Sequence, residues 1–255
     1  MQDKKIIALI PAKGDSTRIP KKNIIPLGGH PLIAYTIHAA IQSGIFESIY
    51  VSTDSQNIAF IAEKYGIGTM IAYMRTIRNK NGTILERSYI DTEITPDILW
   101  VKDVLSKIEA PDYFMILRPT SPFRTEMTIK RAWRQYQDFD EHDSMKSVER
   151  CKQHPYKQWE IDNDYLISLS YLKPRDDNQR GFELPYQSLP EIYAQNGCID
   201  IGETRNVIYR NTVFGEKIMP FFTEGYEGFD LNRREDLILA EALIERGLIK
   251  LPKIK

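Results

Sequence analysis

The first half of the chain alternates between short continuous apolar runs and stretches whose apolar residues recur every three or four positions. The runs at residues 5–10, 48–53, 67–73 and 113–117 predict strands, the first of them buried on both faces. The periodic stretches at residues 31–44, 55–66 and 94–108, and another from about Glu126, predict amphipathic helices. This alternation predicts an α/β fold whose sheet is mainly parallel and carries helices on both faces.

The second half is less regular. Short strands are predicted at residues 144–151, 156–161, 165–169 and 192–201, and a well-patterned helix at residues 234–247. A polar stretch covers residues 173–180, and no internal repeat or low-complexity linker interrupts the sequence. We therefore expect a single domain over residues 1–255, with a β-rich flap inserted at roughly residues 144–190.

Composition narrows the class of protein. The chain has 255 residues, of which 42% are hydrophobic and 27% charged, as is typical of a soluble globular protein. A formal net charge of −1 argues against nucleic-acid binding, which usually needs a basic surface. Two cysteines are too few for a disulfide framework, and no segment approaches the ~20 apolar residues that span a membrane. We expect a cytoplasmic protein that binds neither nucleic acid nor membrane.

Ligands bind α/β sheets at the carboxyl ends of strands, so the segments after Ile10, Thr53 and Leu117 are the candidate sites. The first of these, residues 11–23, contains four cations and one acid: Lys13, Arg18, Lys21, Lys22 and Asp15. Its small residues, among them Gly14 and Ser16, allow backbone N–H groups to surround an anion such as a triphosphate. The alternative is a solvated basic loop, because neither a Walker A nor a dinucleotide-binding spacing is present.

Six blocks of sequence carry a resemblance to a known family. They are residues 10–23, 26–37, 51–54, 118–125, 196–197 and 230–237. In this order they resemble the acylneuraminate cytidylyltransferases, the family of CMP-sialic acid synthetases. The resemblance implies a three-layer nucleotidyltransferase fold with a Rossmann-like sheet and a β-rich dimerisation flap. It also implies a homodimer that joins CTP to an acidic 3-deoxy-2-keto sugar, with Mg²⁺, giving CMP-sugar and pyrophosphate.

The same resemblance implies where the nucleotide binds. The implied nucleotide-binding residues are Ala12, Lys13, Gly14, Ser16, Lys22, Asn23, Arg75 and Asp91. Lys13 stands where relatives usually have arginine, so the charge is kept and the bidentate fork is lost. Asp54 ends the second predicted strand, where it either caps the following helix or faces the substrate.

Asp230 and Asn232 are the candidate metal ligands. On an extended segment, residues two apart project from one face, and hard oxygen ligands suit Mg²⁺. Relatives more often have two aspartates here, and the alternative is that Asn232 only caps the helix after it. We assign catalytic roles to Lys22, Arg18 and Asp230, while the general base is not identified.

The sugar side departs from the family. Arg118 replaces the glutamine of sialic acid enzymes, and Tyr186 stands where they have an arginine for the sugar carboxylate. A carboxylate needs a cation in a partly dry pocket, so we hypothesise that Arg118 and Lys157 supply it. The sugar is then not ordinary N-acetylneuraminate. The remaining candidate substrate residues are Thr120, Ser121 and Asn196.

Two rival functions remain open. One is a sugar-1-phosphate nucleotidyltransferase that uses another NTP, which would need more cations on the sugar side. The other is a nucleotide-binding homologue without activity, suggested by Lys13 and Asn232.

Overall fold

The computed structural model describes residues 4–14, 16, 18–66, 70–74, 96–109, 111–162, 165–169 and 180–254. The chain divides into two compact units. The first combines Met1–Ser147 with Asn196–Lys255, and the second is Val148–Gln195. The second unit overlaps most of the segment expected to be an inserted flap.

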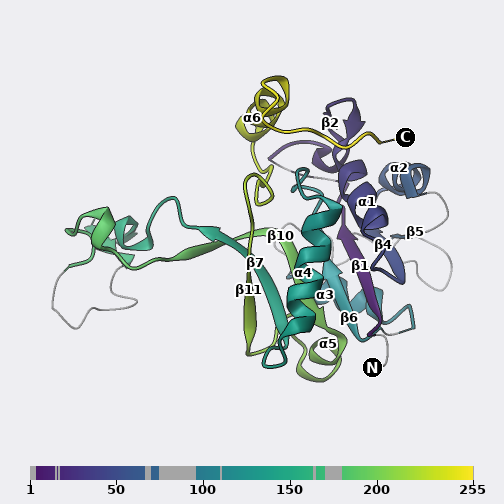
Figure 1. The fold of residues 1–255 in the computed structure, drawn as a ribbon, viewed down its shortest axis with the longest axis horizontal. Coiled ribbons are helices and arrows are strands. Elements are labelled where there is room, and N and C mark those ends of the chain that lie inside the picture. The colour runs from purple at the N-terminus through teal and green to yellow at the C-terminus, as the bar shows by residue number, and fades with distance from the viewer. Residues whose placement is uncertain are drawn as a thin grey trace. The chain divides into compact units, whose positions relative to one another are not determined.

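A seven-stranded sheet has the order β11-β7-β10-β6-β1-β4-β5 (Figure 1). Its strands are β1 (Ile6–Pro11), β4 (Ser48–Thr53), β5 (Met70–Met74), β6 (Tyr113–Ile116), β7 (Ser144–Arg150), β10 (Tyr193–Glu203) and β11 (Ile218–Phe222). Neighbouring pairs among β5, β4, β1 and β6 are parallel, and β10 pairs antiparallel with β6. The prediction of an α/β fold with a mostly parallel central sheet is confirmed.

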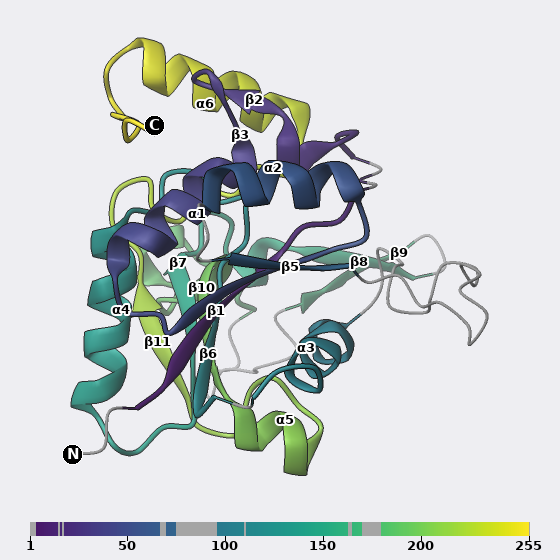
Figure 2. The same cartoon turned by 90° about the vertical axis from the view of Figure 1, so that its right-hand side faces the viewer.

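Helices cover both faces of this sheet (Figure 2). They are α1 (Leu32–Ser43), α2 (Gln56–Gly66) and α4 (Glu126–Asp138) on one face, with α3 (Asp97–Leu105) and α5 (Thr204–Arg210) on the other. The division follows from β1, whose side chains alternate between faces. Ile6, Ala8 and Ile10 pack with the first group of helices, and Ile7 and Leu9 pack with the second. Because β1 is buried on both faces, its sequence is the continuous apolar run noted above.

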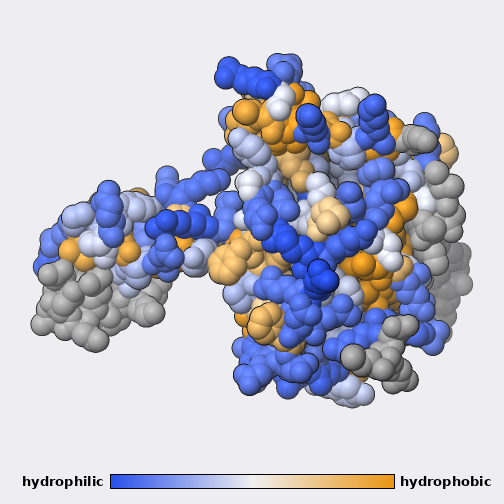
Figure 3. Space-filling view, in the orientation of Figure 1, coloured by the Kyte–Doolittle hydropathy of each residue, from blue (hydrophilic) through white to orange (hydrophobic). Residues whose placement is uncertain are grey.

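A third hydrophobic cluster lies beyond the sheet, around α6 (Arg234–Glu245). Ala240 and Leu243 of α6 pack in this cluster with Leu32 and Tyr35 of α1 and with the fully buried Leu231. The outer side of α6 is also partly apolar, and Figure 3 shows hydrophobic residues gathered over this helix. The cluster fixes the segment before α6 against α1 and against a small hairpin of β2 (Pro26–Leu27) and β3 (His30–Pro31).

The second unit contains the antiparallel pair β8 (Trp159–Asp162) and β9 (Tyr165–Ser168). The strand predicted from residue 156 is wrong at its start, because a 3-10 helix, η3 (Pro155–Lys157), comes first. Proline is favoured at a first helical position, and the His154 ring accepts the Tyr156 N–H at 3.1 Å. A second short 3-10 helix, η5 (Tyr186–Ser188), follows later. In the part of the chain that is described, no helix has the length and apolarity needed to cross a membrane.

Candidate active site

The basic loop after β1 folds back on itself at the carboxyl end of the sheet. The Ala12 N–H donates to the Ser52 carbonyl at 2.9 Å, which extends the pairing of β1 with β4. The Asn23 side-chain amide then donates to the Lys13 carbonyl at 2.9 Å. Lys22 and Asn23 are buried, and Lys21 turns the chain into them with a left-handed φ of 56°. The described residues of the loop are therefore part of the folded structure rather than a solvated basic stretch.

Asp54 holds this loop from the neighbouring strand. Its Oδ1 accepts the Gly14 N–H at 2.6 Å, while the Ser55 hydroxyl accepts the Ile58 N–H in the first turn of α2. The capping role considered for Asp54 thus belongs to Ser55. A Cβ at Gly14 would lie 2.9 Å from the Ser55 Cβ, so this approach favours glycine.

The Asp54–Gly14 contact was not predicted from sequence. The adjacency of β1 and β4 in a parallel sheet is the signal that could have indicated it, since their carboxyl ends meet at one edge.

Lys22 reaches across the site to the segment before α6. Its Nζ donates to Asn232 Oδ1 at 3.3 Å, and Asn232 Nδ2 donates to Asp230. Asn232 does not cap α6, because Arg233 holds the N-cap position. Asp236 accepts the backbone N–H groups of Asn232 and Arg233 at 2.8 and 2.7 Å. Residues 210 positions apart thus form one polar chain at the loop.

The Arg118–Thr125 region joins the same site through its backbone. The Thr120 carbonyl accepts the Leu231 N–H at 2.8 Å, between Asp230 and Asn232. Ser121 is buried, and within the described residues its hydroxyl has no hydrogen-bond partner. Three segments that carry sequence-predicted residues therefore meet here: the basic loop, the 118–125 block and the segment before α6.

The donor set fits a partly hydrated Mg²⁺ ion. Among the described residues, no group of three or more His, Cys, Asp or Glu side chains is placed to hold a metal. Asp230 supplies one half-buried carboxylate, and the Asn232 oxygen faces Lys22. Mg²⁺ typically takes one or two protein carboxylates and completes its shell with phosphate oxygens and water. An ion at this place would rest mainly on Asp230.

Arg118 belongs to a separate network of charged side chains. Its Nη2 donates to Asp97 at 2.6 Å and to Asp200 at 3.3 Å, and Lys146 approaches Asp200 at 3.6 Å. Gly197 leaves room for Arg118, since a Cβ there would lie 3.3 Å from its Cδ. Arg118 therefore already has carboxylate partners within the protein.

The pKa values of Asp97 and Asp200 shift in opposite directions. Burial alone would raise the pKa of Asp97, but the hydrogen bond and charge of Arg118 outweigh it and hold that pKa below its ordinary value. For Asp200, which is almost wholly buried, desolvation dominates and raises the pKa despite Arg118 and Lys146.

Arg124 and Asn196 hold neighbouring segments of the chain together by hydrogen bonds. Arg124 is fully buried and donates to the Cys198 carbonyl at 2.6 Å, the Thr36 hydroxyl at 2.7 Å and the Arg118 carbonyl at 3.1 Å. Asn196 donates to the Thr223 hydroxyl at 2.8 Å and accepts the Cys198 N–H at 3.2 Å. Arg124 was missed as a site-shaping residue, although its place in the 118–125 block could have suggested it.

The remaining predicted residues are less constrained. Lys157, in the second unit, donates to the carbonyls of Phe182 and Leu184 at 2.7 and 2.6 Å. Because Arg118 belongs to the first unit, their joint role in binding a carboxylate stays a prediction. Arg18 is exposed and makes no ion pair with a described residue, and Arg75 and Asp91 lie outside the described residues.

In a mostly parallel α/β fold, a cationic loop after the first strand that is linked through Asn232 to the Asp230 carboxylate is the arrangement expected of a nucleotidyltransferase. Within that class, a family model described as Cytidylyltransferase matches residues 7–164. The chain belongs to this family of enzymes.

Curated relatives match along most of the chain. A CMP-N,N'-diacetyllegionaminic acid synthase of Legionella pneumophila is 32% identical over 246 residues, covering 94% of this chain and 97% of that protein. An N-acylneuraminate cytidylyltransferase of Escherichia coli O18:K1:H7 is 30% identical over 243 residues, 92% of this chain. The chain spans about half of that longer relative, 51% of its length. The resemblance stated from sequence is confirmed.

A solved structure of CMP:2-keto-3-deoxy-manno-octonic acid synthetase in complex with CTP shares the fold. Its TM-score is 0.66, and the match covers 95% of this chain and 99% of that one at 15% identity.

Proposed function

We propose that this chain transfers CMP from CTP to an acidic 3-deoxy-2-keto sugar, releasing pyrophosphate. The observation that carries the proposal is the polar chain from Lys22 through Asn232 to Asp230, closed over a folded basic loop. It places a cation and a carboxylate together, as transfer from a metal-bound triphosphate requires. The names of the relatives support CTP and an acidic sugar as the two substrates.

In the proposed reaction, the anomeric hydroxyl of the sugar attacks the α-phosphorus of CTP and pyrophosphate leaves in line. Such a transfer asks mostly for positioning and charge neutralisation. Lys13, Arg18 and Lys22 would neutralise the phosphates, and Asp230 would hold Mg²⁺, which supplies Lewis-acid stabilisation of phosphate charge. Asn232 links Lys22 to Asp230, so Lys22 and a cation held by Asp230 would act on the same phosphates.

The sugar we propose is a nonulosonic or related acid other than N-acetylneuraminate. Support comes from Arg118, which replaces the glutamine of the sialic acid enzymes. Because Arg118 is paired with Asp97 and Asp200, a sugar carboxylate would have to compete with these two acids for it. We also propose that the enzyme works as a homodimer in the cytoplasm.

The test is pyrophosphate release with each NTP, measured across a panel of nonulosonic and octulosonic acids. We expect turnover with CTP and Mg²⁺. In Lys22→Ala the rate should fall ~100-fold or more, because removing one hydrogen-bond donor to a transition state typically has an effect of this size. Lys21→Ala is the matched control, because it removes an exposed charge next in sequence.

Near-normal rates in Lys22→Ala would remove the loop from the mechanism. Pyrophosphate release with another NTP and a sugar 1-phosphate would favour a sugar-1-phosphate nucleotidyltransferase. Binding of CTP without turnover on any sugar acid would favour a non-catalytic homologue. Clear preference for N-acetylneuraminate would contradict the sugar assignment alone.

A further inference from the structure

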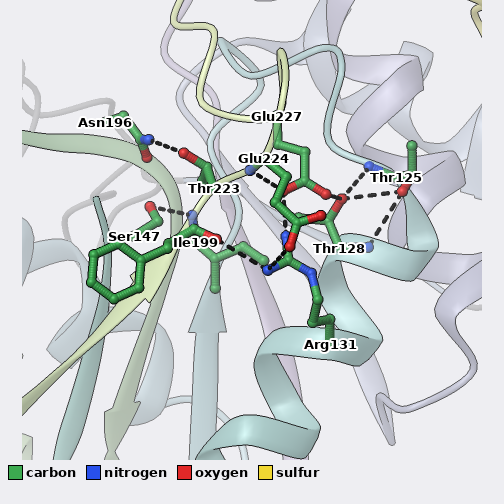
Figure 4. A network of polar contacts seen from close by, with 10 residues as sticks. Thr125, Thr128, Arg131, Ser147, Asn196, Ile199, Thr223, Glu224 and Glu227 are labelled. Carbon is green, nitrogen blue, oxygen red and sulfur yellow. Dashed lines mark hydrogen bonds and ion pairs between the residues drawn. The ribbon is translucent and has the colours of Figure 1, made fainter. Parts of the chain in front are cut away.

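A second polar network ties α4 to the loop that leads to Asp230 (Figure 4). Its centre is Glu227, whose side chain is 18% exposed. One carboxylate oxygen accepts the Thr128 hydroxyl at 2.7 Å, and the other accepts Arg131 Nη2 at 2.5 Å and the Glu224 N–H at 2.8 Å. Glu227 therefore connects two positions of α4 with the backbone of its own loop.

Arg131 strengthens this connection. Its Nη1 donates to the Phe222 carbonyl at 3.0 Å, and its guanidinium lies over the Phe221 ring, 4.4 Å from the centroid. It also approaches Glu224 at 3.3 Å, but that side chain is 75% exposed. An exposed ion pair contributes little, whereas a fork shared between a carboxylate and a carbonyl fixes geometry. Arg131 thus fixes the end of β11 and the start of the loop.

The loop is also held at both of its ends. At the start, Thr223 accepts the Asn196 side-chain amide at 2.8 Å (Figure 4). The loop packs so closely here that a Cβ at Gly228 would lie 2.3 Å from Asn196 Nδ2. At the far end, the Leu231 N–H donates to the Thr120 carbonyl at 2.8 Å. Glu227 lies between these two points, three residues before Asp230, and its side chain provides the contacts to α4.

We propose that Glu227 is a positioning residue, which holds the loop so that Asp230 and Asn232 meet Lys22 at the nucleotide. The inference rests on the proposed function, in which Asp230 holds Mg²⁺. Glu227 is not placed as a ligand, since both of its oxygens accept hydrogen bonds from α4 or from its own loop. Loss of a group that hydrogen-bonds a metal ligand directly typically weakens metal affinity ~10–100-fold, and because Glu227 acts on Asp230 through the loop backbone we expect the lower end of that range.

The experiment compares Glu227→Ala with Glu224→Ala in the full chain. Both changes remove a carboxylate that pairs with Arg131, but only Glu227 also bonds Thr128 and the loop backbone. Calorimetric titration of Mn²⁺ in the presence of CTP, without sugar, reads metal affinity independently of turnover. We expect ~10-fold weaker Mn²⁺ binding in Glu227→Ala, a matching rise in the Mg²⁺ concentration for half-maximal rate, and less than ~2-fold change in Glu224→Ala.

Glu227→Gln separates positioning from general stability, because it keeps the side-chain length and one acceptor oxygen, while the other oxygen becomes an NH2 donor and the charge is lost. We expect it to bind Mn²⁺ more tightly than Glu227→Ala, and if Glu227→Ala does not fold, Glu227→Gln and Arg131→Lys take its place. Unchanged Mn²⁺ affinity in the Glu227 variants, while Asp230→Asn weakens binding, would overturn the inference and leave the proposed function standing. Unchanged affinity in Asp230→Asn itself would instead refute the metal site on which both depend.

Discussion

At the scale of single residues, the site depends on charged side chains that hold backbone and amide groups of other segments. Asp54 is the clearest case, because its carboxylate accepts the Gly14 N–H at 2.6 Å. In the proposed triphosphate-binding loop, an anion this close would oppose phosphate binding through its charge and favour it by ordering the backbone. The net effect is therefore measurable only when charge and hydrogen bond are separated.

The first prediction separates them at Asp54. Asp54→Asn and Asp54→Ala both remove the charge, but only asparagine keeps an acceptor for the Gly14 N–H. We expect Asp54→Ala to raise the KM for CTP ~5-fold above that of Asp54→Asn, since a hydrogen bond contributes about 1 kcal/mol. Steady-state kinetics with CTP varied would measure this, and equal KM values in the two variants would show that the contact does not order the loop.

The second prediction concerns Asn232, which gives Lys22 an oxygen and donates to Asp230. Asn232→Asp adds a second hard anionic ligand two residues from Asp230, so we expect the Mg²⁺ concentration for half-maximal rate to fall several-fold, roughly threefold or more. Asn232→Ala is the control, since it removes the oxygen and should raise that concentration. An Asn232→Asp enzyme with unchanged Mg²⁺ dependence would place the metal away from this segment.

At the scale of elements, the sequence predicted those helices and strands whose burial produces a regular pattern of apolar residues. β4 was predicted at residues 48–53 and is Ser48–Thr53, because buried strands read as apolar or β-branched runs. The helix predicted to stop at Gly44 does so with a φ of 63°. α5 and β11 were missed, since α5 has only seven residues and β11 contains Pro220.

The candidate site was predictable in its chemistry and not in its contacts. The basic loop stands out because it follows the first predicted strand, and Asp230 was indicated by the family resemblance. The contacts of Gly14 with Asp54, of Lys22 with Asn232 and of Arg131 with Glu227 join residues 40, 210 and 96 positions apart. No local periodicity encodes such pairs, because they depend on how the strands and loops fold together.

The third prediction concerns α3, whose first residue, Asp97, bonds Arg118 and the Trp100 indole. Because the folded protein lowers the pKa of Asp97, its ionised form stabilises the fold above the ordinary carboxyl range, and this contribution is lost as pH falls toward the lowered pKa. Asp97→Asn should therefore lower the free energy of unfolding by about 1 kcal/mol at pH 7, a value that allows for the partial exposure of Asp97. The difference in free energy between the variant and the unmodified chain should become smaller below about pH 4.

Urea unfolding at several pH values measures this difference. Asp103→Asn is the control on the same helix, because Asp103 pairs with Lys107 at the surface and should contribute little at any pH. A constant Asp97→Asn difference from pH 7 to below pH 4 would assign its effect to packing rather than to charge.

At the scale of the whole molecule, the two units differ in how they bury apolar surface. The first has three hydrophobic clusters around a seven-stranded sheet. The second has the two-stranded pair of β8 and β9, and an isolated two-stranded sheet is marginally stable in water. Ile161 and Leu166 lie directly opposite each other on that pair and are 75% and 61% exposed. Such a face gains stability when another apolar surface covers it.

The last prediction is that the proposed homodimer forms through this face. Ile161→Asp places a charge on the apolar side, so sedimentation velocity at micromolar concentration should show a dimer for the unmodified chain and a monomer for the variant. Glu160→Lys is the matched control, because neighbouring strand residues point to opposite faces and Glu160 pairs with Ile167 on the other one. A monomeric unmodified chain would refute the dimer, whereas a dimer that survives Ile161→Asp and not Glu160→Lys would place the contact on the opposite face.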